Sequence, residues 1–547
     1  MMKWRALLRN QWFQLCLLVA LLSGATTIYN TVNVKSTSSS GAASRPSSTP
    51  PPVRKISPKK PGQWILDASG ARDSDSKDIQ IVAASLTEGD LVTVRPGTYT
   101  GSCEIAVSAR FVGPAPGTGI ATIRCVEPKR AGMSISGKKV SLENLSINLD
   151  CSTSTQAKFG VYVHENASLT AENSHFQASG KGCCLKYEGT SRGSLGHCTF
   201  SGGQWGLEVN DAAQIEASNC AFQKLGLANG NGNTVSIMGE HASAKLDTCE
   251  FTENTATVFA DKGATLTVIG CTFRNNGITD DAENVNTGLV CVRNKAKAFL
   301  RVDNFDNNKQ GVVATMAGNV TLQNARMHQT GLVTANQKIA WYSNAVAASG
   351  EGTTMIVDDC YIADSPSAGF LISSGAHLKA AKTVVSNSGK VGLQLGVHDS
   401  ARSSADLDSV QFIDSPGNGA MAEVGSQLTM RGCRVSDIGH NGIAANDQGT
   451  RVNMSETWVK NCQECGLMAI SGATISVTGG TIESNKWGAQ AGLPNDPAKS
   501  GTILLTGCAV QGNTLGLAAC QGATLTMKGG TLEKNRSDTT GEVRVER

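Results

Sequence analysis

The chain has 547 residues, enough for a large buried core, and its 60 glycines and 5% aromatic residues favour tight turns and small stacked side chains. Charged residues make up only 17% of the chain and the formal net charge is +3. Nucleic-acid binding usually requires a strongly basic surface, so we expect no nucleic-acid partner.

Residues 1–34 begin with three basic side chains and continue as an apolar run that ends in small residues near Ala25. This pattern predicts a secretory signal peptide. No charge interrupts residues 10–34, so the segment also fits an uncleaved membrane anchor, and of the two alternatives we favour cleavage. In both cases we expect an exported protein that is secreted, at the cell surface, or held to the membrane by this segment alone.

A Ser-, Thr- and Pro-rich stretch with a basic end follows at residues 35–62, and we expect a disordered linker. Residues 63–131 are predicted to form an N-terminal cap and the first coils. Residues 75–86 carry apolar side chains at helical spacing, and residues 90–101 read as two strands around a Pro-Gly turn. A helix that covers the first coil is expected because an open solenoid end exposes unpaired backbone.

Residues 132–535 repeat one pattern: an opening glycine, a short alternating strand, a turn, and a second strand that closes on a cysteine and an aromatic residue. The opening positions recur mostly every 22 to 24 residues, and a period of this size indicates a solenoid. Residues 536–547 are predicted to be a C-terminal tail. The opening residues are Gly160, Gly182, Gly206, Thr234, Thr257, Gly288, Gly311, Ala345, Gly369, Gly392, Gly419, Gly442, Gly466, Gly488 and Gly516.

The stretch Asp-Leu-Val-Thr-Val-Arg-Pro-Gly-Thr-Tyr-Thr-Gly at residues 90–101, followed by these repeats, resembles the right-handed parallel β-helix superfamily with the pectate-lyase-like fold. The resemblance covers about residues 64–535. It implies an all-β solenoid of three parallel sheets with a short N-terminal capping helix. The superfamily includes polysaccharide lyases, hydrolases and epimerases, and also repeat proteins without an assigned reaction, so the fold does not decide the function.

In this fold the residues after each opening position form the first sheet, whose outer groove is where the family's enzymes usually act. Strand alternation places positions +1 and +3 inward and positions +2 and +4 outward. From Val290 and Val292 onward the predicted outward face is mostly small or apolar, and Cys184 is also predicted to face outward. The N-terminal coils instead present polar and aromatic side chains: Tyr162, His164, Lys186, Glu208, Asn210, Phe259 and Asp261.

Three of these residues are candidates for catalysis. Lys186 is a candidate base that removes a proton from a sugar ring, with His164 or Glu208 as its partner. We expect Lys186 and Glu208 to be diagonal neighbours, with His164 one coil before Lys186. Exposed Lys–Glu pairs are common on sheets, and neither an acidic calcium cluster nor converging aspartates accompany them. We therefore favour a non-catalytic role and expect no metal and no cofactor.

Long gaps between coils predict three loops, at residues 226–233, 275–286 and 329–344, that project on one side of the groove. Loops on a rigid scaffold often carry recognition. Asp280, Asp281, Trp341 and Tyr342 are candidates to hold a sugar by hydrogen bonds and stacking. The alternative is that the acidic side chains are merely solvated and that Trp341 covers a coil edge.

Seven cysteines occupy one slot of the repeat, which predicts a ladder of reduced core thiols. Cys103 and Cys125 are the best candidates for a disulfide, whereas Cys462 and Cys465 are too isolated to indicate a metal site. The ladder consists of Cys198, Cys220, Cys249, Cys271, Cys360, Cys433 and Cys508.

The leading hypothesis is an exported or membrane-tethered β-helix scaffold that binds a polysaccharide or a cell-surface protein. One alternative is a polysaccharide lyase, hydrolase or epimerase that acts in the groove of the first sheet. The other is a structural surface rod whose apolar C-terminal face packs on another chain. The sequence leaves the oligomeric state open.

Overall fold

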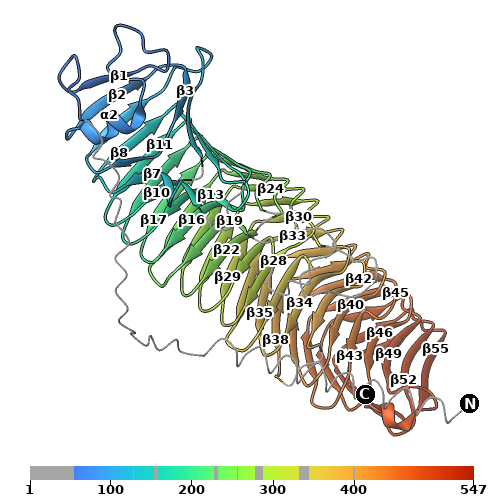
Figure 1. Cartoon of the computed structure of the whole chain (residues 1–547). Helices are drawn as coiled ribbons and strands as arrows, with labels where there is room; N and C mark the ends of the chain where they lie inside the picture. The colour runs from blue at the N-terminus through green and yellow to red at the C-terminus, as the bar shows by residue number, and fades with distance from the viewer. Residues whose placement is uncertain are drawn as a thin grey trace, which may run out of the picture. The chain divides into compact units, whose positions relative to one another are not determined.

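The computed structural model describes residues 55–126, 128–152, 158–226, 232–255, 257–277, 288–331, 344–397 and 401–546 (Figure 1). In these residues the helical elements are α2 (Ile79–Ser85) and one short 3₁₀ turn, η2 (Pro497–Lys499). The predicted signal or anchor at residues 1–34 lies outside the described residues. Within the described ranges, no helix is long and apolar enough to cross a membrane.

The strands form three parallel sheets, here called sheets A, B and C, and each turn of the solenoid, or coil, contributes one strand to each sheet. Sheet A consists of β1 (Gln63–Leu66), β2 (Asp90–Val94), β5 (Ala109–Val112), β8 (Val140–Glu143), β11 (Ser168–Glu172), β14 (Arg192–Gly196), β17 (Gln214–Ser218), β20 (Ser243–Asp247), β23 (Thr265–Ile269), β26 (Lys297–Arg301), β29 (Asn319–Gln323), β32 (Thr354–Asp358), β35 (His377–Ala381), β38 (Ser404–Asp408), β41 (Gln427–Arg431), β44 (Arg451–Ser455), β47 (Thr474–Thr478), β50 (Thr502–Thr506), β53 (Thr524–Lys528) and β56 (Val543–Glu546). Sheet B consists of β3 (Gly97–Thr100), β6 (Ala121–Val126), β9 (Ser146–Asp150), β12 (His175–Ala178), β15 (Thr199–Ser201), β18 (Ala221–Gln223), β21 (Glu250–Thr252), β24 (Thr272–Arg274), β27 (Asn304–Asp306), β30 (Arg326–His328), β33 (Tyr361–Ala363), β36 (Val384–Ser386), β39 (Gln411–Ile413), β42 (Arg434–Ile438), β45 (Trp458–Cys462), β48 (Thr481–Glu483), β51 (Ala509–Gln511) and β54 (Thr531–Glu533). Sheet C consists of β4 (Cys103–Ile105), β7 (Ala131–Ile135), β10 (Lys158–Val163), β13 (Gly182–Tyr187), β16 (Trp205–Asn210), β19 (Asn233–Met238), β22 (Thr257–Asp261), β25 (Val290–Val292), β28 (Val312–Thr315), β31 (Val346–Ser349), β34 (Ala368–Ser373), β37 (Val391–Leu395), β40 (Asn418–Ala422), β43 (Ile443–Ala445), β46 (Cys465–Ala469), β49 (Trp487–Ala491), β52 (Leu515–Ala519) and β55 (Ser537–Gly541).

Each strand pairs with its equivalent in the next coil, as β11 does with β14 in sheet A and β10 with β13 in sheet C. This arrangement confirms the predicted all-β solenoid of three parallel sheets. The coils stack along one axis from the blue N-terminal strands to the red C-terminal strands of Figure 1. Sheet C is the sheet that follows the opening residues and therefore corresponds to the predicted first sheet.

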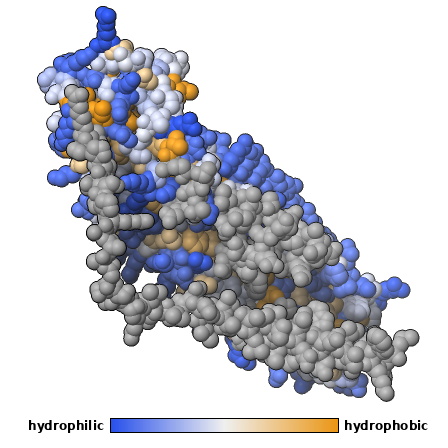
Figure 2. Space-filling view, viewed as in Figure 1, coloured by the Kyte–Doolittle hydropathy of each residue, from blue (hydrophilic) through white to orange (hydrophobic). Residues whose placement is uncertain are grey.

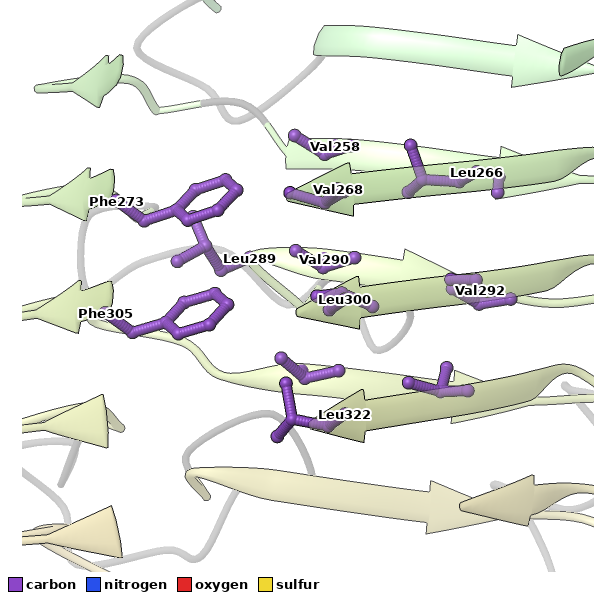
Figure 3. Close-up of a cluster of buried hydrophobic side chains, with 14 of the residues drawn as sticks. Val258, Leu266, Val268, Phe273, Leu289, Val290, Val292, Leu300, Phe305 and Leu322 are labelled. Atoms are coloured by element: carbon purple, nitrogen blue, oxygen red, sulfur yellow. The ribbon is translucent and has the colours of Figure 1, made fainter. Parts of the chain in front are cut away.

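The interior is a column of aliphatic and aromatic side chains. Phe rings from six successive coils of sheet B stack with centroid separations of 4.5 to 5.1 Å and small interplanar angles. Phe273 and Phe305 are the last two of this stack, and Figure 3 shows them beside the aliphatic residues of the other sheets. In-register parallel strands place identical side chains about 4.8 Å apart, so a repeated slot becomes a continuous stack. On the visible face of Figure 2 hydrophilic residues predominate, with small hydrophobic patches near the first coils.

The seven cysteines of the repeat slot are all buried free thiols. Cys198, Cys220, Cys249 and Cys271 come from consecutive coils, and the backbone N–H of Cys249 donates to the Sγ of Cys271 at 3.3 Å. In the next coil the same slot holds Asp303, whose Oδ1 accepts from the N–H of Cys271 at 2.8 Å. Cys103 and Cys125, the predicted disulfide candidates, are also free thiols.

Asparagines at the coil ends form a second ladder. Asn485 donates from its amide to Asn513, and Asn513 donates in the same way to Asn535, each at 3.0 Å. The side chains of Asn254 and Asn276 pair in the same manner. These contacts show that the asparagine side chains link neighbouring coils through hydrogen bonds.

The opening glycines have a steric cause. A Cβ built on Gly466 would lie 2.6 Å from the carbonyl oxygen of Gly488, its equivalent in the next coil, and one on Gly442 would lie 2.8 Å from that of Gly466. Real Cβ atoms do not approach a carbonyl oxygen this closely, because the contact is well inside van der Waals distance. The opening glycines therefore recur with the coil period because neighbouring backbones approach each other closely at that position.

The two ends of the described body differ. At the N-terminal end α2 begins at the N-cap Asp78 and packs its buried residues Ile79 and Val82 near β4, as predicted for a capping helix. Residues 55–62, assigned to the linker, contact this cap, because the N–H of Ile56 donates to the Oγ of Ser85 at 3.0 Å and the Ile56 side chain packs on the core. At the other end β55 and β56 pair with β52 and β53, so strand pairing continues beyond residue 535.

Candidate functional site

The candidate residues lie on the outer face of sheet C, where in-register pairing sets them in rows across the coils. One row runs through the N-terminal coils at about 4.8 Å per coil. It consists of Ser134, Tyr162, Lys186, Glu208, Ser236, Phe259, Cys291 and Val313. We call it the Tyr162 row.

The register of β13 corrects the prediction for Lys186. Lys186 pairs directly with Tyr162 on one side and Glu208 on the other, so Lys186 and Glu208 are not diagonal neighbours. His164 is the first residue after β10, and Glu188 is the first residue after β13. The residue that corresponds to His164 in the next coil is therefore Glu188, not Lys186. The cause is the opening slot, which holds Cys184 rather than Gly182: a Cβ on Gly160 would lie 2.7 Å from the Cys184 oxygen. Cys184 therefore faces the core, not the outer face.

A second correction concerns Val290 and Val292. Both point into the core, in the same interior as Val258 and Leu300 (Figure 3). Leu289 occupies the opening slot in place of Gly288, and a slip of one residue moves each side chain to the opposite face. Cys291 accordingly pairs with Phe259.

Arg130, Tyr162, Lys186 and Glu188 form one hydrogen-bonded group, here called the Tyr162 cluster. The Tyr162 hydroxyl donates to the Glu188 carboxylate, and it accepts from Arg130 at 2.6 Å. Lys186 Nζ lies 3.2 Å from one Glu188 oxygen, and Arg130 lies 3.3 Å from the other. One carboxylate thus holds two cations and a phenol from different coils.

Aromatic contacts fix the same group. The Tyr162 ring stacks on His164 at 4.7 Å and on Phe159 at 5.5 Å between centroids. The Arg130 guanidinium lies 4.3 Å from the Tyr162 centroid, and Lys186 Nζ lies 4.8 Å from the Phe159 centroid. Cations over aromatic faces are attracted by the ring quadrupole, and this attraction grows when they are desolvated.

These contacts also set the protonation of the cluster. Burial, and then the hydrogen bond to Glu188, raises the pKa of Tyr162 to about 12. For Glu188, burial alone would raise the pKa, but the hydrogen bonds and charges of Tyr162, Lys186 and Arg130 outweigh it and hold the pKa below its ordinary value. At neutral pH the phenol is therefore protonated and the carboxylate ionised.

A second group, here called the Asp261 cluster, lies further along the same face. Asp261 is 3% exposed, and its carboxylate accepts from Arg293 at 3.1 and 3.2 Å and from the Asn294 amide at 2.6 Å. The Arg293 guanidinium also lies 4.6 Å from the Phe259 centroid. The combination of aromatic ring, cation and carboxylate from adjacent coils repeats the design of the Tyr162 cluster.

Glu208 and Asn210 lie between the two clusters. Asn210 donates to the Glu208 carboxylate at 3.1 Å, and both side chains are half-buried. His164 lies at the edge of the Tyr162 cluster, where its Nε2 is 3.0 Å from Ser134 Oγ. Of the predicted residues, the structure brings His164, Tyr162 and Lys186 together, and Phe259 with Asp261.

Arg130, Glu188, Arg293 and Asn294 belong to these clusters but were not predicted. Glu188 and Arg293 were missed because of the two register errors. Counted from the opening residues Cys184 and Leu289, Glu188 lies beside His164 and Arg293 lies beside Asp261. Arg130 precedes β7 and has no pattern that links it to Tyr162. Asn294 adopts a positive φ of 50°, a left-handed turn conformation in which asparagine is common. An asparagine just after the strand is thus the one local feature of the sequence that points to this position.

The remaining candidates are not placed. Asp280, Asp281, Trp341 and Tyr342 lie outside the described residues, so their role stays a prediction. Across the described ranges, no three His, Cys, Asp or Glu side chains are grouped so as to hold a metal ion.

The sequence matches the family model of the right-handed β-helix region in four overlapping segments, residues 123–273, 159–326, 229–400 and 304–515. No curated protein gives a significant match to it.

Several solved structures are similar to the chain at low sequence identity and low TM-score. The catalytic unit of the GH87 α-1,3-glucanase from Streptomyces thermodiastaticus is 14% identical with a TM-score of 0.37, over 71% of this chain and 66% of the glucanase chain. Pectate lyase Pel9A is 12% identical with a TM-score of 0.30, over 66% and 77% of the two chains. An alginate lyase from Paenibacillus is 14% identical with a TM-score of 0.27, over 56% and 91%. Since the family model spans most of the sequence, the chain belongs to the right-handed β-helix family.

Proposed function

We propose that the protein is an exported scaffold that binds a polysaccharide on the outer face of sheet C, between the Tyr162 and Asp261 clusters. The observation that supports this is the pair of clusters, each built from an aromatic ring, a cation and a carboxylate on adjacent coils. From Ser134 to Cys291 the Tyr162 row extends over six coil steps, roughly 29 Å at the usual strand spacing. A strip of this length and narrow width suits an extended polymer.

The side chains of the strip are held in place before any ligand binds. Lys186 has an 11% exposed side chain and is fixed by Glu188 and Phe159, and Arg293 is fixed by Asp261 and Phe259. Preorganised side chains lose little entropy on binding. Arg130, with its side chain 65% exposed, offers its free guanidinium face and remaining N–H groups to a ligand.

The same pairing argues against catalysis. A general base must be free to take a proton, whereas Lys186 is in an ion pair with Glu188. Glu188 has a lowered pKa and Tyr162 a raised one, so at neutral pH neither readily exchanges a proton. The alternative function, a lyase, hydrolase or epimerase, is favoured only by the proximity of His164, Tyr162 and Lys186 on neighbouring coils.

Arg130→Ala is expected to weaken polysaccharide binding about tenfold, because it removes an exposed guanidinium worth roughly one charge-assisted contact. Binding is measured by affinity electrophoresis in gels that contain acidic or neutral polysaccharides. Arg124→Ala is the matched control, since Arg124 is also an exposed arginine in an ion pair with a carboxylate, Asp150, but lies on sheet B. Equal weakening in both variants, or no binding by the wild type, would contradict the proposal.

Two outcomes favour the other functions. Turnover of a polysaccharide that is lost in Lys186→Ala would establish the enzyme. Self-association of the wild type in sedimentation velocity, with no glycan retained, would favour the structural rod.

A further inference from the structure

Two aromatic side chains are exposed on the outer face of sheet B. Trp458 on β45 is 56% exposed and Tyr361 on β33 is 48% exposed. Elsewhere in the described ranges, the Phe, Tyr and Trp side chains are more covered, most of them in the core. An exposed aromatic ring offers a large apolar face, and covering that face with a ligand is favourable.

Tyr361 and Trp458 lie in one row of sheet B. In-register pairs join its members from coil to coil without interruption: Arg326, Tyr361, Val384, Gln411, Arg434 and Trp458. We call it the Trp458 row. Tyr361 and Trp458 are four coil steps apart, roughly 19 Å at about 4.8 Å per coil.

Each exposed aromatic residue has an arginine in the coil before it. Arg326 precedes Tyr361 and Arg434 precedes Trp458, and both arginines are exposed. The arginine–aromatic pair therefore occurs twice, with the same order and a four-coil spacing. Val384 and Gln411, which separate the two pairs, are half-buried and leave the row open to solvent.

These arginines differ from others on the same sheet. Arg124 is paired with Asp150 at 3.1 Å, and Arg274 with Asp306 at 3.6 Å. Within the described part of the chain, neither Arg326 nor Arg434 lies within ion-pair distance of a carboxylate. Their guanidinium groups are thus available for an anionic ligand.

We propose that the Trp458 row is a second binding surface, for a linear acidic polysaccharide that lies along the solenoid axis. The Tyr361 and Trp458 rings stack on the apolar faces of two sugar rings, and Arg434 and Arg326 bind carboxylate groups through paired N–H donors. Two equivalent anchors in line fit a polymer with a repeated unit. A protein partner normally buries about 800 Å² on each side in a compact patch, which a single row of side chains does not provide.

This surface is on a different sheet from the Tyr162 and Asp261 clusters and shares no residue with them. Binding at this surface is therefore independent of the proposed function, and variants on sheet B and on sheet C distinguish the two binding surfaces.

The test uses the full chain with polygalacturonate as the acidic probe and dextran as the neutral one. Trp458→Ala and Arg434→Gln are each expected to weaken polygalacturonate binding about tenfold in affinity electrophoresis or calorimetry. Trp458→Phe keeps a stacking ring and is expected to retain most of the affinity. Arg451→Ala, an exposed arginine on sheet A, is the charge-matched control and is expected to bind like the wild type.

Arg130→Ala weakens binding at the sheet C surface, so the binding that remains in this variant can be assigned to the sheet B surface. Residual binding in Arg130→Ala that disappears when Trp458→Ala is added supports the second surface. The proposal is overturned if, in the Arg130→Ala background, Trp458→Ala and Arg434→Gln cause no further loss of binding, if Arg451→Ala causes an equal loss there, or if the remaining binding is as tight for dextran as for polygalacturonate. It is also overturned if Trp458→Ala abolishes self-association instead, which would identify a protein interface.

Discussion

The free energy of unfolding of the wild type is expected to fall by about 4 kcal/mol between pH 4 and pH 7 because of Asp303, and in Asp303→Asn this decrease is expected to be absent. Asp303 is 2% exposed and occupies the slot that holds cysteine in the preceding coils. Its Oδ1 accepts from the N–H of Cys271 at 2.8 Å, whereas its Oδ2 is buried and has no hydrogen-bond partner among the residues that the structure describes. A buried carboxylate without a cation is costly, so the protonated form is favoured.

The direction of the effect follows from the pKa of this carboxyl group. Burial raises it from 3.8 to about 7, against the weaker opposing effect of the backbone N–H groups of Cys271 and Arg301. Below pH 4 both the folded and the unfolded chain carry the proton, so the full stability is present. Between pH 4 and pH 7 the unfolded chain releases it while the folded chain retains it, and stability falls as the pH rises.

The measurement is urea denaturation of wild type and variants at several pH values between 4 and 7.5. Other carboxyl groups also titrate in this range, so the difference between wild type and Asp303→Asn is the quantity of interest. Asp408→Asn, which changes an exposed aspartate on sheet A, is the control and should keep the wild-type pH dependence. Parallel curves for wild type and Asp303→Asn would show that Asp303 does not titrate as expected.

Asp303→Cys provides a second variant that continues the thiol ladder. The N–H of Cys271 then meets a thiol, as the N–H of Cys249 does at Cys271. This variant is expected to lack the pH dependence and to be more stable than the wild type at pH 7, because no ionisable carboxyl group remains buried there.

The fold was predictable because one slot of the repeat is under a steric constraint that appears in the sequence. Opening glycines recur where a Cβ would meet the next coil, and each fixes which following side chains face inward. The prediction failed at two coils in which another residue fills the slot and a glycine lies one or two positions before it. In the coil of Cys184, Gly182 was taken for the opening residue, so the outward positions were assigned two residues too early. In the coil of Leu289, Gly288 was taken instead, so inward and outward side chains were exchanged.

The candidate site was predictable only in part for the same reason. Tyr162, Lys186, Phe259 and Asp261 were found by alternation, since each follows a correctly or nearly correctly placed opening residue. Their partners depend on pairing across 26 to 58 residues of sequence, as the contacts of Tyr162 and Arg130 with Glu188 do. A single sequence contains the alternation within a strand but not the register between strands when coil lengths vary.

Gly466→Ala is expected to destabilise the solenoid by about 3 kcal/mol, because the new methyl group has no room. Its Cβ would lie 2.6 Å from the Gly488 oxygen, 2.8 Å from Asn485 Nδ2 and 2.9 Å from Ile482. Two of these neighbours belong to the hydrogen-bonded framework: the Gly488 carbonyl is part of the next coil's backbone, and Asn485 belongs to the asparagine ladder. Relief of the clash therefore requires the coils to separate, which weakens the sheet C pairing between β46 and β49.

Gly479→Ala in the same coil separates this clash from the conformational cost of replacing a glycine. Gly479 has a φ of 65°, yet no atom of the described part of the chain lies within 4 Å of a Cβ built there. The left-handed backbone alone is expected to cost about 1 kcal/mol, and the two variants are compared by thermal and urea denaturation. A loss for Gly466→Ala no larger than for Gly479→Ala would mean that adjacent coils yield easily. The opening glycines would then reflect backbone conformation rather than the close approach of neighbouring coils.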